Sequence, residues 1–187
     1  QLEPLTVIIG PNAAGKSNLL DALGLLSRMV NSDTLKEAFS EHRGVPIEAF
    51  YYGDEGLDGL LAQETAQFTI EVDVELSEDV VKAVEQRIQQ VREGLPEQET
   101  TRKASRRRVV ERQLRYSLTV EIMTKTGYLR VLDERLVALN KDGSVRRSRR
   151  AFVEKTENRL LLRRERGAGR PTEYEVGLDY TLVSTPL

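Results

Sequence analysis

The chain has 187 residues, a formal net charge of −2 and no cysteine. A chain of this length can bury a single sizeable core, or one core plus a small appendage. The lack of cysteine excludes disulfides and thiolate metal sites, and it favours a reducing, cytoplasmic environment. No stretch approaches the roughly 20 apolar residues of a membrane-spanning helix, so we expect no membrane segment.

A phosphate-binding loop motif lies close to the start of the sequence. Residues 10–17 read Gly-Pro-Asn-Ala-Ala-Gly-Lys-Ser, which matches the pattern G-x-x-x-x-G-K-[ST]. The apolar run Leu5–Ile9 precedes the motif and predicts a buried strand, and a helical pattern follows it. A loop between a strand and a helix N-terminus directs backbone N–H groups and the helix dipole at phosphates. The sequence therefore predicts a site for a nucleoside triphosphate with Mg²⁺, and ATP is the nucleotide implied by the family resemblance described below.

Each part of the loop has an expected chemical role. The backbone amides from Asn12 to Lys16 should surround the β-phosphate, and the Lys16 ammonium should reach the β- and γ-oxygens. The Ser17 hydroxyl should bind Mg²⁺. The alternative is a glycine-rich turn that binds nothing. The predicted nucleotide-binding set is Gly10, Pro11, Asn12, Ala13, Ala14, Gly15, Lys16, Ser17 and Asn18.

The next part of the chain combines helices with one strand. Apolar residues at helical spacing predict a helix over 16–30 that packs on a sheet. A short helix is expected at 32–41, and acidic, glycine-rich loops are expected at 53–59. Alternating apolar and polar residues over 68–76 predict a half-buried strand.

The second half of the chain changes from a helical period to a period of two. A helix cap at Ser77, an apolar stripe and a Gly-Leu-Pro break predict a helical hairpin over 77–113. Short turns between the strands that follow imply antiparallel pairing. These strands are predicted at 114–123, 128–139, 151–156, 159–164 and 173–183.

Residues 5–23 resemble the start of an SMC/RecF-type ATPase of the ABC class. The Gly-Pro-Asn opening of the loop and the Ser-Asn-x-x-Asp-Ala sequence after its lysine are more specific than the bare loop pattern. Prokaryotic RecF-like and overcoming-lysogenization-defect-like ATPases are similar in this way. The resemblance implies an α/β P-loop NTPase fold, here a partial head with an antiparallel β subdomain and an inserted helical hairpin.

The resemblance implies three parts. Residues 1–76 would be the strand–helix core, residues 77–113 the hairpin insertion, and residues 114–187 the antiparallel β subdomain. The second half of such a head carries a Leu-Ser-Gly-Gly-type signature, an Asp-Glu strand and a histidine. None of these is convincingly present, so we expect this chain to be a piece of a longer protein.

Three features imitate the missing parts. Residues 131–134 read Val-Leu-Asp-Glu, but Arg130 interrupts the apolar run, so an exposed strand end is the expected reading. His42 is interpreted as a solvated loop residue. Gln63 and Gln67 are the nearest candidates for the family's glutamine loop, and the alternative is that both are ordinary polar loop residues. Catalytic residues remain unknown. We therefore expect weak ATP binding and negligible hydrolysis, with turnover in a longer parent that forms a head-to-head homodimer.

Charge is distributed unevenly along the chain. Residues 1–95 contain 7 Lys+Arg and 17 Asp+Glu, a net of −10, whereas residues 96–187 contain 21 and 13, a net of +8. Basic clusters in the second half could contact nucleic-acid phosphates without reading the sequence. Solvated surface and charged hairpin tips are an equally open interpretation. The nucleic-acid candidates are Arg102, Lys103, Arg106, Arg107, Arg108, Arg146, Arg147, Arg149 and Arg150, and a third cluster comprises Arg163, Arg164, Arg166 and Arg170.

Together these features predict the ATP-binding N-terminal part of an SMC/RecF-like ATPase. Its parent would act in DNA repair, recombination or anti-phage defence. Two alternatives stay open: a protein-interaction module that is switched by nucleotide without turnover, and a P-loop kinase of small molecules.

Overall fold

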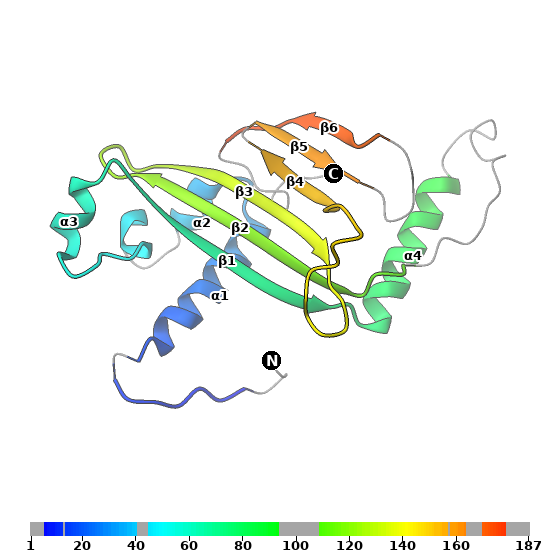
Figure 1. Cartoon of the computed structure of the whole chain (residues 1–187), viewed down its shortest axis with the longest axis horizontal. Helices are drawn as coiled ribbons and strands as arrows, with labels where there is room; N and C mark the ends of the chain where they lie inside the picture. The colour runs from blue at the N-terminus through cyan, green and yellow to red at the C-terminus, as the bar shows by residue number, and fades with distance from the viewer. Residues whose placement is uncertain are drawn as a thin grey trace. The chain divides into compact units, whose positions relative to one another are not determined.

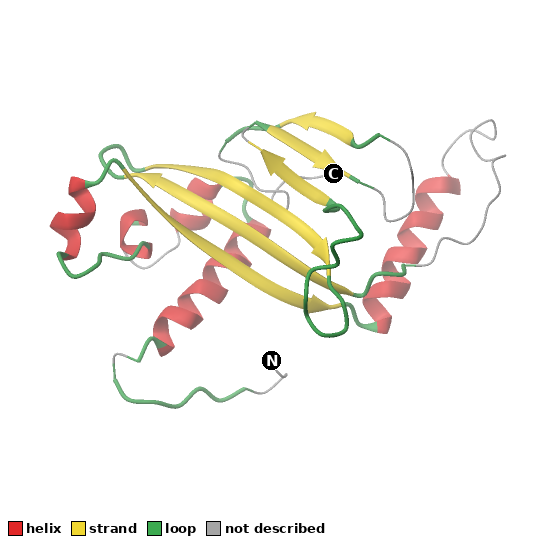
Figure 2. Cartoon of the chain, viewed as in Figure 1, coloured by secondary structure: helices red, strands yellow, loops and turns green. Residues whose placement is uncertain are grey.

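The fold combines short helices with one antiparallel sheet (Figures 1 and 2). The computed structural model describes residues 6–12, 14–40, 45–93, 109–156, 158–163 and 170–178. Its helices are α1 (Lys16–Asn31), α2 (Leu35–Ser40), the 3-10 helix η1 (Pro46–Ala49), α3 (Gly56–Ala62) and α4 (Glu78–Glu93). Its strands are β1 (Thr65–Glu75), β2 (Gln113–Met123), β3 (Tyr128–Ala138), β4 (Val153–Thr156), β5 (Arg159–Leu162) and β6 (Thr172–Glu175).

The sheet is six-stranded, and each strand pairs with its neighbours in the sequence, in the order β1-β2-β3-β4-β5-β6. The pairs β3–β4, β4–β5 and β5–β6 are antiparallel. This confirms the mixed α/β character and the antiparallel sheet expected from the short turns. Gly127 and Gly143 have φ angles of 70° and 78°, which the turns on either side of β3 require and which favour glycine.

The chain divides into two compact units, which are described separately. Unit 1 comprises residues 1–70, 119–132 and 177–187, and unit 2 comprises residues 71–118 and 133–176. The three long strands each contribute one end to each unit.

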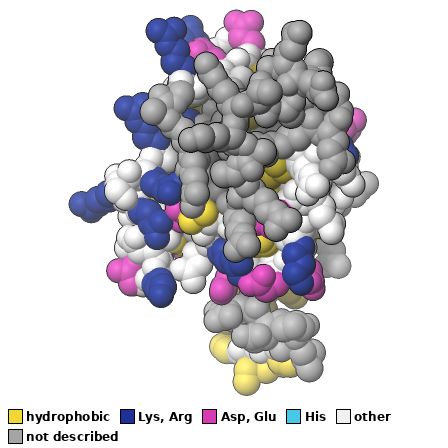
Figure 3. All heavy atoms as spheres, turned by 90° about the vertical axis from the view of Figure 1, so that its right-hand side faces the viewer, with side chains coloured by type: hydrophobic (Ala, Val, Ile, Leu, Met, Phe, Trp, Pro, Cys, Tyr) yellow, Lys and Arg dark blue, Asp and Glu magenta, His cyan; other side chains and the backbone are white. Residues whose placement is uncertain are grey.

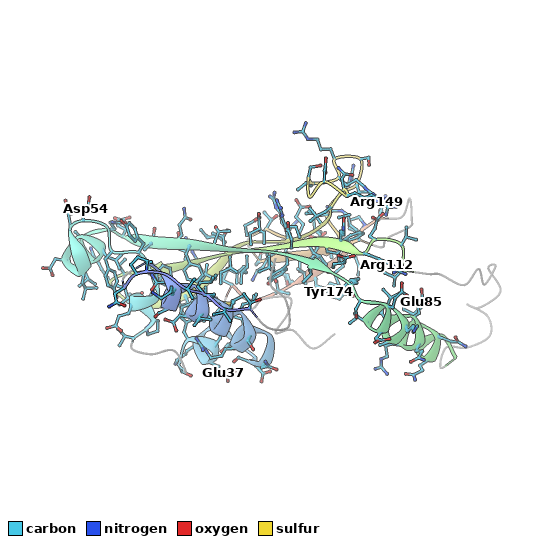
Figure 4. The ribbon with its side chains drawn as sticks, turned by 90° about the horizontal axis from the view of Figure 1, so that it is seen from below. Glu37, Asp54, Glu85, Arg112, Arg149 and Tyr174 are labelled. Carbon is cyan, nitrogen blue, oxygen red and sulfur yellow. The ribbon has the colours of Figure 1, made fainter. Side chains whose placement is uncertain are left out.

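The core of unit 1 lies between helices and one face of its part of the sheet. Helices α1 and α2 cover this face (Figure 4). They are joined by a 3.0 Å hydrogen bond from Arg28 Nε to the carbonyl of Ala38. Three rings lie at the centre. The ring of Phe39 on α2 lies 6.4 Å from that of Phe50 and 6.3 Å from that of Phe68 on β1, and the last two lie 5.0 Å apart. Aromatic packing therefore fixes α2 against the sheet.

Strand β3 changes the face that it buries part of the way along its length. On β2 the buried positions alternate regularly from 116 to 120, and residues 120–122 are all buried. On β3, Leu129 and Val131 are buried, and the next buried positions are Glu134 and Ala138. Side chains of a regular strand alternate between faces with a period of two, so a step of three residues moves the pattern to the opposite face.

We infer a β-bulge in β3 from this change. One extra residue in a strand shifts the alternation of faces by one position. The turn between β2 and β3 is closed by a 2.8 Å hydrogen bond from the Gly127 amide to the Met123 carbonyl, and at the other end the Leu139 amide donates to the Gln113 carbonyl over 2.8 Å. The step of three from Val131 to Glu134 places the extra residue between these two positions.

Several elements differ from those expected. The acidic, glycine-rich segment 53–59 contributes to helix α3, because leucines at 57, 60 and 61 give it an apolar side and Leu60 is buried. The second helix of the predicted hairpin does not reach Gln113, because residues 109–112 are irregular and Gln113 begins β2. Residues 94–108 lie outside the described residues. None of the described helices has the length and apolarity needed to cross a bilayer.

The phenylalanine cluster leads to a stability prediction. Phe39 is fully buried, so Phe39→Ala should lower the free energy of unfolding by about 3–5 kcal/mol. Tyr51→Ala is the matched control, since Tyr51 is 85% exposed and its loss should change stability by no more than about 0.5 kcal/mol. Urea unfolding followed by circular dichroism measures both. Equal effects of the two substitutions would contradict the packing described here.

Candidate functional site

The phosphate-loop motif forms a tight turn at the start of α1. The Ala14 amide and the Pro11 carbonyl are 3.4 Å apart, and Gly15 has a φ of 79° in the left-handed region. Helix α1 then begins at Lys16, and its first backbone bond joins the Leu19 amide to the Gly15 carbonyl at 3.1 Å. The glycine is required because a side chain in this conformation costs about 1–2 kcal/mol.

The Lys16 side chain folds back over the loop. Its ammonium donates hydrogen bonds to the carbonyl of Gly10 over 2.9 Å and to that of Pro11 over 2.6 Å. These contacts bring the two ends of the motif together, so that the backbone curls around the ammonium. The carbonyls are neutral partners and do not cancel the charge of the ammonium, which can move from them to an anion that enters the loop.

The N-terminus of α1 adds to this positive potential. Its capping residue is Gly15, which provides no side-chain hydrogen bond, and the first turn contains no acidic residue. The first amides of a helix have no partner within the helix, and the dipole gives them a partial positive charge. A lysine, a helix N-terminus and the absence of a nearby carboxylate on that turn together favour an anion, above all a phosphate.

A magnesium ion at this site would have to arrive with its ligand. Ser17 is exposed on the first turn of α1, beside Lys16, and offers one hydroxyl. No group of three or more His, Cys, Asp or Glu side chains in the described residues could hold a metal ion. Mg²⁺ is commonly bound by one or two protein oxygens together with phosphate oxygens and water. The donor set here fits that mode, with the phosphates supplying most ligands.

The strand expected before the loop is not formed. Residues 6–9 belong to none of the strands, and Val7 and Ile9 are 75% and 87% exposed. A strand exists only where a neighbour pairs with its backbone, and the sheet is built from hairpin partners that begin at β1. The prediction of a buried strand from this apolar run is therefore wrong for residues 6–9.

Most members of the predicted nucleotide-binding set lie together in this turn. Ala13, His42 and the first basic cluster, residues 102–108, lie outside the described residues. Gln63 is the C-cap of α3, and its carbonyl accepts a hydrogen bond from the Thr124 hydroxyl. Gln67 is exposed on β1.

The Val131–Glu134 segment is corrected by the structure. It is not an exposed strand end: Glu134 is completely buried in the middle of β3, because the extra residue turns it inward. The Tyr116 hydroxyl donates to the Glu134 carboxylate over 2.6 Å. Burial and this carboxylate raise the pKa of Tyr116 far above its usual value. Glu134 is therefore part of the core of unit 2 and cannot act as a water-accessible base.

The second basic cluster is split by its contacts. Arg146 and Arg149 both bind the carboxylate of Glu111, whereas Arg147 and Arg150 are exposed. No sequence pattern distinguishes these two pairs of arginines, because the role of each depends on the position of Glu111 in space. In the third cluster, Arg163 pairs with Glu154 at 2.8 Å.

Residues 5–84 match the model of the family described as "AAA domain, putative AbiEii toxin, Type IV TA system". The match contains the phosphate loop, all of α1–α3 and β1, and it ends inside α4. It supports a P-loop ATPase type of domain, with nucleotide and Mg²⁺ as the ligands that such a domain implies. It covers less than half of the chain and does not distinguish the SMC/RecF class. No curated protein and no solved structure is significantly similar to the chain.

Two glycine substitutions test the geometry of the turn. Gly15→Ala should destabilise the protein by about 1 kcal/mol, because Gly15 has a positive φ although nothing lies within 4 Å of an added Cβ. Gly24→Ala should stabilise it by about 0.5–1 kcal/mol, because Gly24 is inside α1 and its Cβ would meet only the flexible end of Arg28 at 3.4 Å. Urea unfolding gives both signs. A Gly15→Ala variant as stable as the Gly24→Ala variant would refute the left-handed turn.

Proposed function

We propose that residues 10–18 bind the triphosphate of ATP with Mg²⁺, as part of an SMC/RecF-like ATPase head. The observation that carries the proposal is the position of the Lys16 ammonium. It is bound to the Gly10 and Pro11 carbonyls inside a turn that leads directly into a helix N-terminus. The family match over residues 5–84 supports nucleotide binding at the coarser level of a P-loop domain.

Each group has a defined task in this proposal. The left-handed Gly15 lets the backbone turn so that the amides before and within the first turn of α1 face one point. Lys16 exchanges its carbonyl partners for β- and γ-phosphate oxygens. Ser17 supplies one oxygen to Mg²⁺, which neutralises charge on the β- and γ-phosphates when it is bound with the nucleotide.

We propose that this chain alone hydrolyses ATP negligibly. Hydrolysis needs a group that orients the attacking water beside the γ-phosphate. Of the two carboxylates that imitate an Asp-Glu strand, Glu134 is completely buried, and Asp133 pairs with Arg135 at 3.1 Å. Turnover would then depend on a head-to-head homodimer of the full protein, in which the partner's signature completes the loop site.

The biological setting proposed is ATP-dependent work on DNA in the cytoplasm, such as repair, recombination or anti-phage defence. It is supported by the resemblance of residues 5–23 and by the basic second half of the chain. A P-loop kinase of small molecules would show phosphate transfer to an acceptor. A nucleotide-switched interaction module would bind ATP without turnover even in the presence of DNA. Turnover of the full protein with and without DNA separates these alternatives.

Nucleotide binding is tested with Lys16→Ala. A hydrogen bond to a charged group contributes about 1.5–3 kcal/mol, so ATP affinity should fall about tenfold or more. Lys36→Ala removes the same charge from an exposed position on α2 and should leave the affinity unchanged. Titration calorimetry with Mg²⁺ and a non-hydrolysable ATP analogue measures both. If the two variants bind like the unmodified chain, the loop is not a nucleotide site.

Turnover makes a separate prediction. Phosphate release by this chain should not exceed that of Lys16→Ala measured in parallel, because no exposed carboxylate of the imitated Asp-Glu segment is available to orient water. A colorimetric phosphate assay checks it. Steady turnover that Lys16→Ala abolishes would show that the catalytic group lies within these residues.

A further inference from the structure

The loop between β3 and β4 is exposed, yet several hydrogen bonds within it fix its backbone. The Asn140 amide donates to the Ser144 carbonyl over 2.8 Å, and the Gly143 amide donates to the Asn140 carbonyl over 3.0 Å. The Asp142 carboxylate accepts from both the hydroxyl and the amide of Ser144, which lowers its pKa and keeps it ionised. We call residues 139–152 the arginine loop. Figure 4 shows it extending away from the sheet, with Arg149 labelled.

A buried carboxylate holds the base of the arginine loop. Glu111 is only 6% exposed. Arg146 Nη1 lies 2.9 Å from each of its oxygens, and Arg149 Nε lies 3.0 Å from one of them. The Arg149 amide also donates to the Arg146 carbonyl over 3.0 Å, which closes a turn between them. We call Glu111, Arg146 and Arg149 the Glu111 cluster. Two guanidinium groups on one carboxylate make the cluster structural and leave it positively charged.

The two remaining arginines of the loop have the opposite environment. Arg147 lies inside the turn closed by the Glu111 cluster, Arg150 follows it, and both are exposed. In the described part of the chain no ion pair is formed by either of them, nor by Arg87 or Arg170, whereas several other arginines of unit 2 are paired. Arg112 pairs with Glu78, Arg115 with Glu71 and Asp73, Arg159 with Glu173, and Arg163 with Glu154.

This contrast separates the arginine loop from an ordinary charged surface. On the face in Figure 3, Lys and Arg side chains predominate along the left side, and acidic side chains lie beside basic ones at the lower edge. Interspersed charges of both signs are expected where charges only keep a surface solvated. A loop that only needed to be soluble would not require a buried carboxylate, two guanidinium groups and a hydrogen-bonded turn. Fixing the backbone reduces the entropy that Arg147 and Arg150 lose when they bind an anion.

We propose that Arg147 and Arg150 contact the phosphate backbone of nucleic acid, and that Glu111, Arg146 and Arg149 are positioning residues for them. Both side chains are exposed, so a single phosphate would gain little from them in water. A polymer of phosphates engages several cations at once and releases its counterions, which favours nucleic acid over an isolated phosphate group. Contacts to phosphate alone predict little sequence preference. This inference rests on the proposed role in DNA metabolism, and it does not depend on nucleotide binding by the phosphate loop.

The first test uses Arg147→Ala/Arg150→Ala and a labelled duplex of arbitrary sequence. Fluorescence anisotropy gives the affinity at about 50 mM and about 200 mM salt. Loss of two phosphate contacts should reduce the slope of log affinity against log salt by about 1.8. Lys82→Ala/Arg87→Ala removes the same charge from exposed positions on α4 and should leave the slope unchanged. Equal effects of the two double variants, or no salt-dependent binding, would overturn the proposal.

The second test separates positioning from total charge. Glu111→Gln makes the protein more positive by one charge, so simple attraction predicts tighter DNA binding. If the Glu111 cluster positions the loop, the same variant should bind DNA more weakly, while circular dichroism shows that it remains folded. Tighter binding would mean that Arg146 and Arg149 bind phosphate once released, which contradicts their assignment.

Two controls identify the ligand and the site. A multiply phosphorylated peptide that binds through Arg147 and Arg150 while duplex DNA does not would overturn the assignment to nucleic acid. ATP binding is measured on every variant. If Lys16-dependent ATP binding persists while DNA binding is absent, the arginine loop proposal fails and nucleotide binding stands. If ATP binding is absent while the salt dependence of DNA binding still depends on Arg147 and Arg150, the nucleotide-binding proposal fails and the arginine loop proposal stands.

Discussion

The left-handed backbone at Gly15 is the constraint on which the candidate site depends. It directs the chain from the loop into α1, and without it the helix would not begin directly at Lys16. Because α1 begins there, the Lys16 ammonium reaches back to the Gly10 and Pro11 carbonyls, and the first-turn amides lie beside the same loop. The anion-attracting character of the site is thus largely a backbone property, with one side-chain charge added to it.

Where the sequence pattern was strong, it predicted the structure well. Helix α1, strand β1 and the hairpin of β2 and β3 follow from clear periodicity and from turn glycines. The segment 53–59 was harder, because glycine and acidic residues favour loops while its leucines favour a helix, and burial of Leu60 decided between them. The run Val7–Ile9 shows the opposite limit, since apolar residues favour a strand but cannot create the neighbour that a strand requires.

Two properties could not have been obtained from residue order. The extra residue in β3 leaves no mark on composition, yet it moves Glu134 from a water-facing position to the core. In the same way, Arg146, Arg147, Arg149 and Arg150 look equivalent in the sequence, and only the place of Glu111 in three dimensions separates those that hold the loop from those that face solvent. In both cases a long-range contact assigns the role.

The extra residue in β3 also affects which misfolded strand registers are accessible to the chain. It places Glu134 directly opposite Lys155 on β4, and both side chains are almost completely buried. If β4 slipped by one position, its lysine would move to the other face of the sheet and leave a carboxylate in an apolar interior, where an uncompensated charge is very unfavourable. Misregistered hairpins are therefore energetically disfavoured from the moment the core closes. The buried pair of Glu134 and Lys155 therefore favours the native register of β3 and β4. The four-residue strand β4 has too few apolar contacts to select that register by itself.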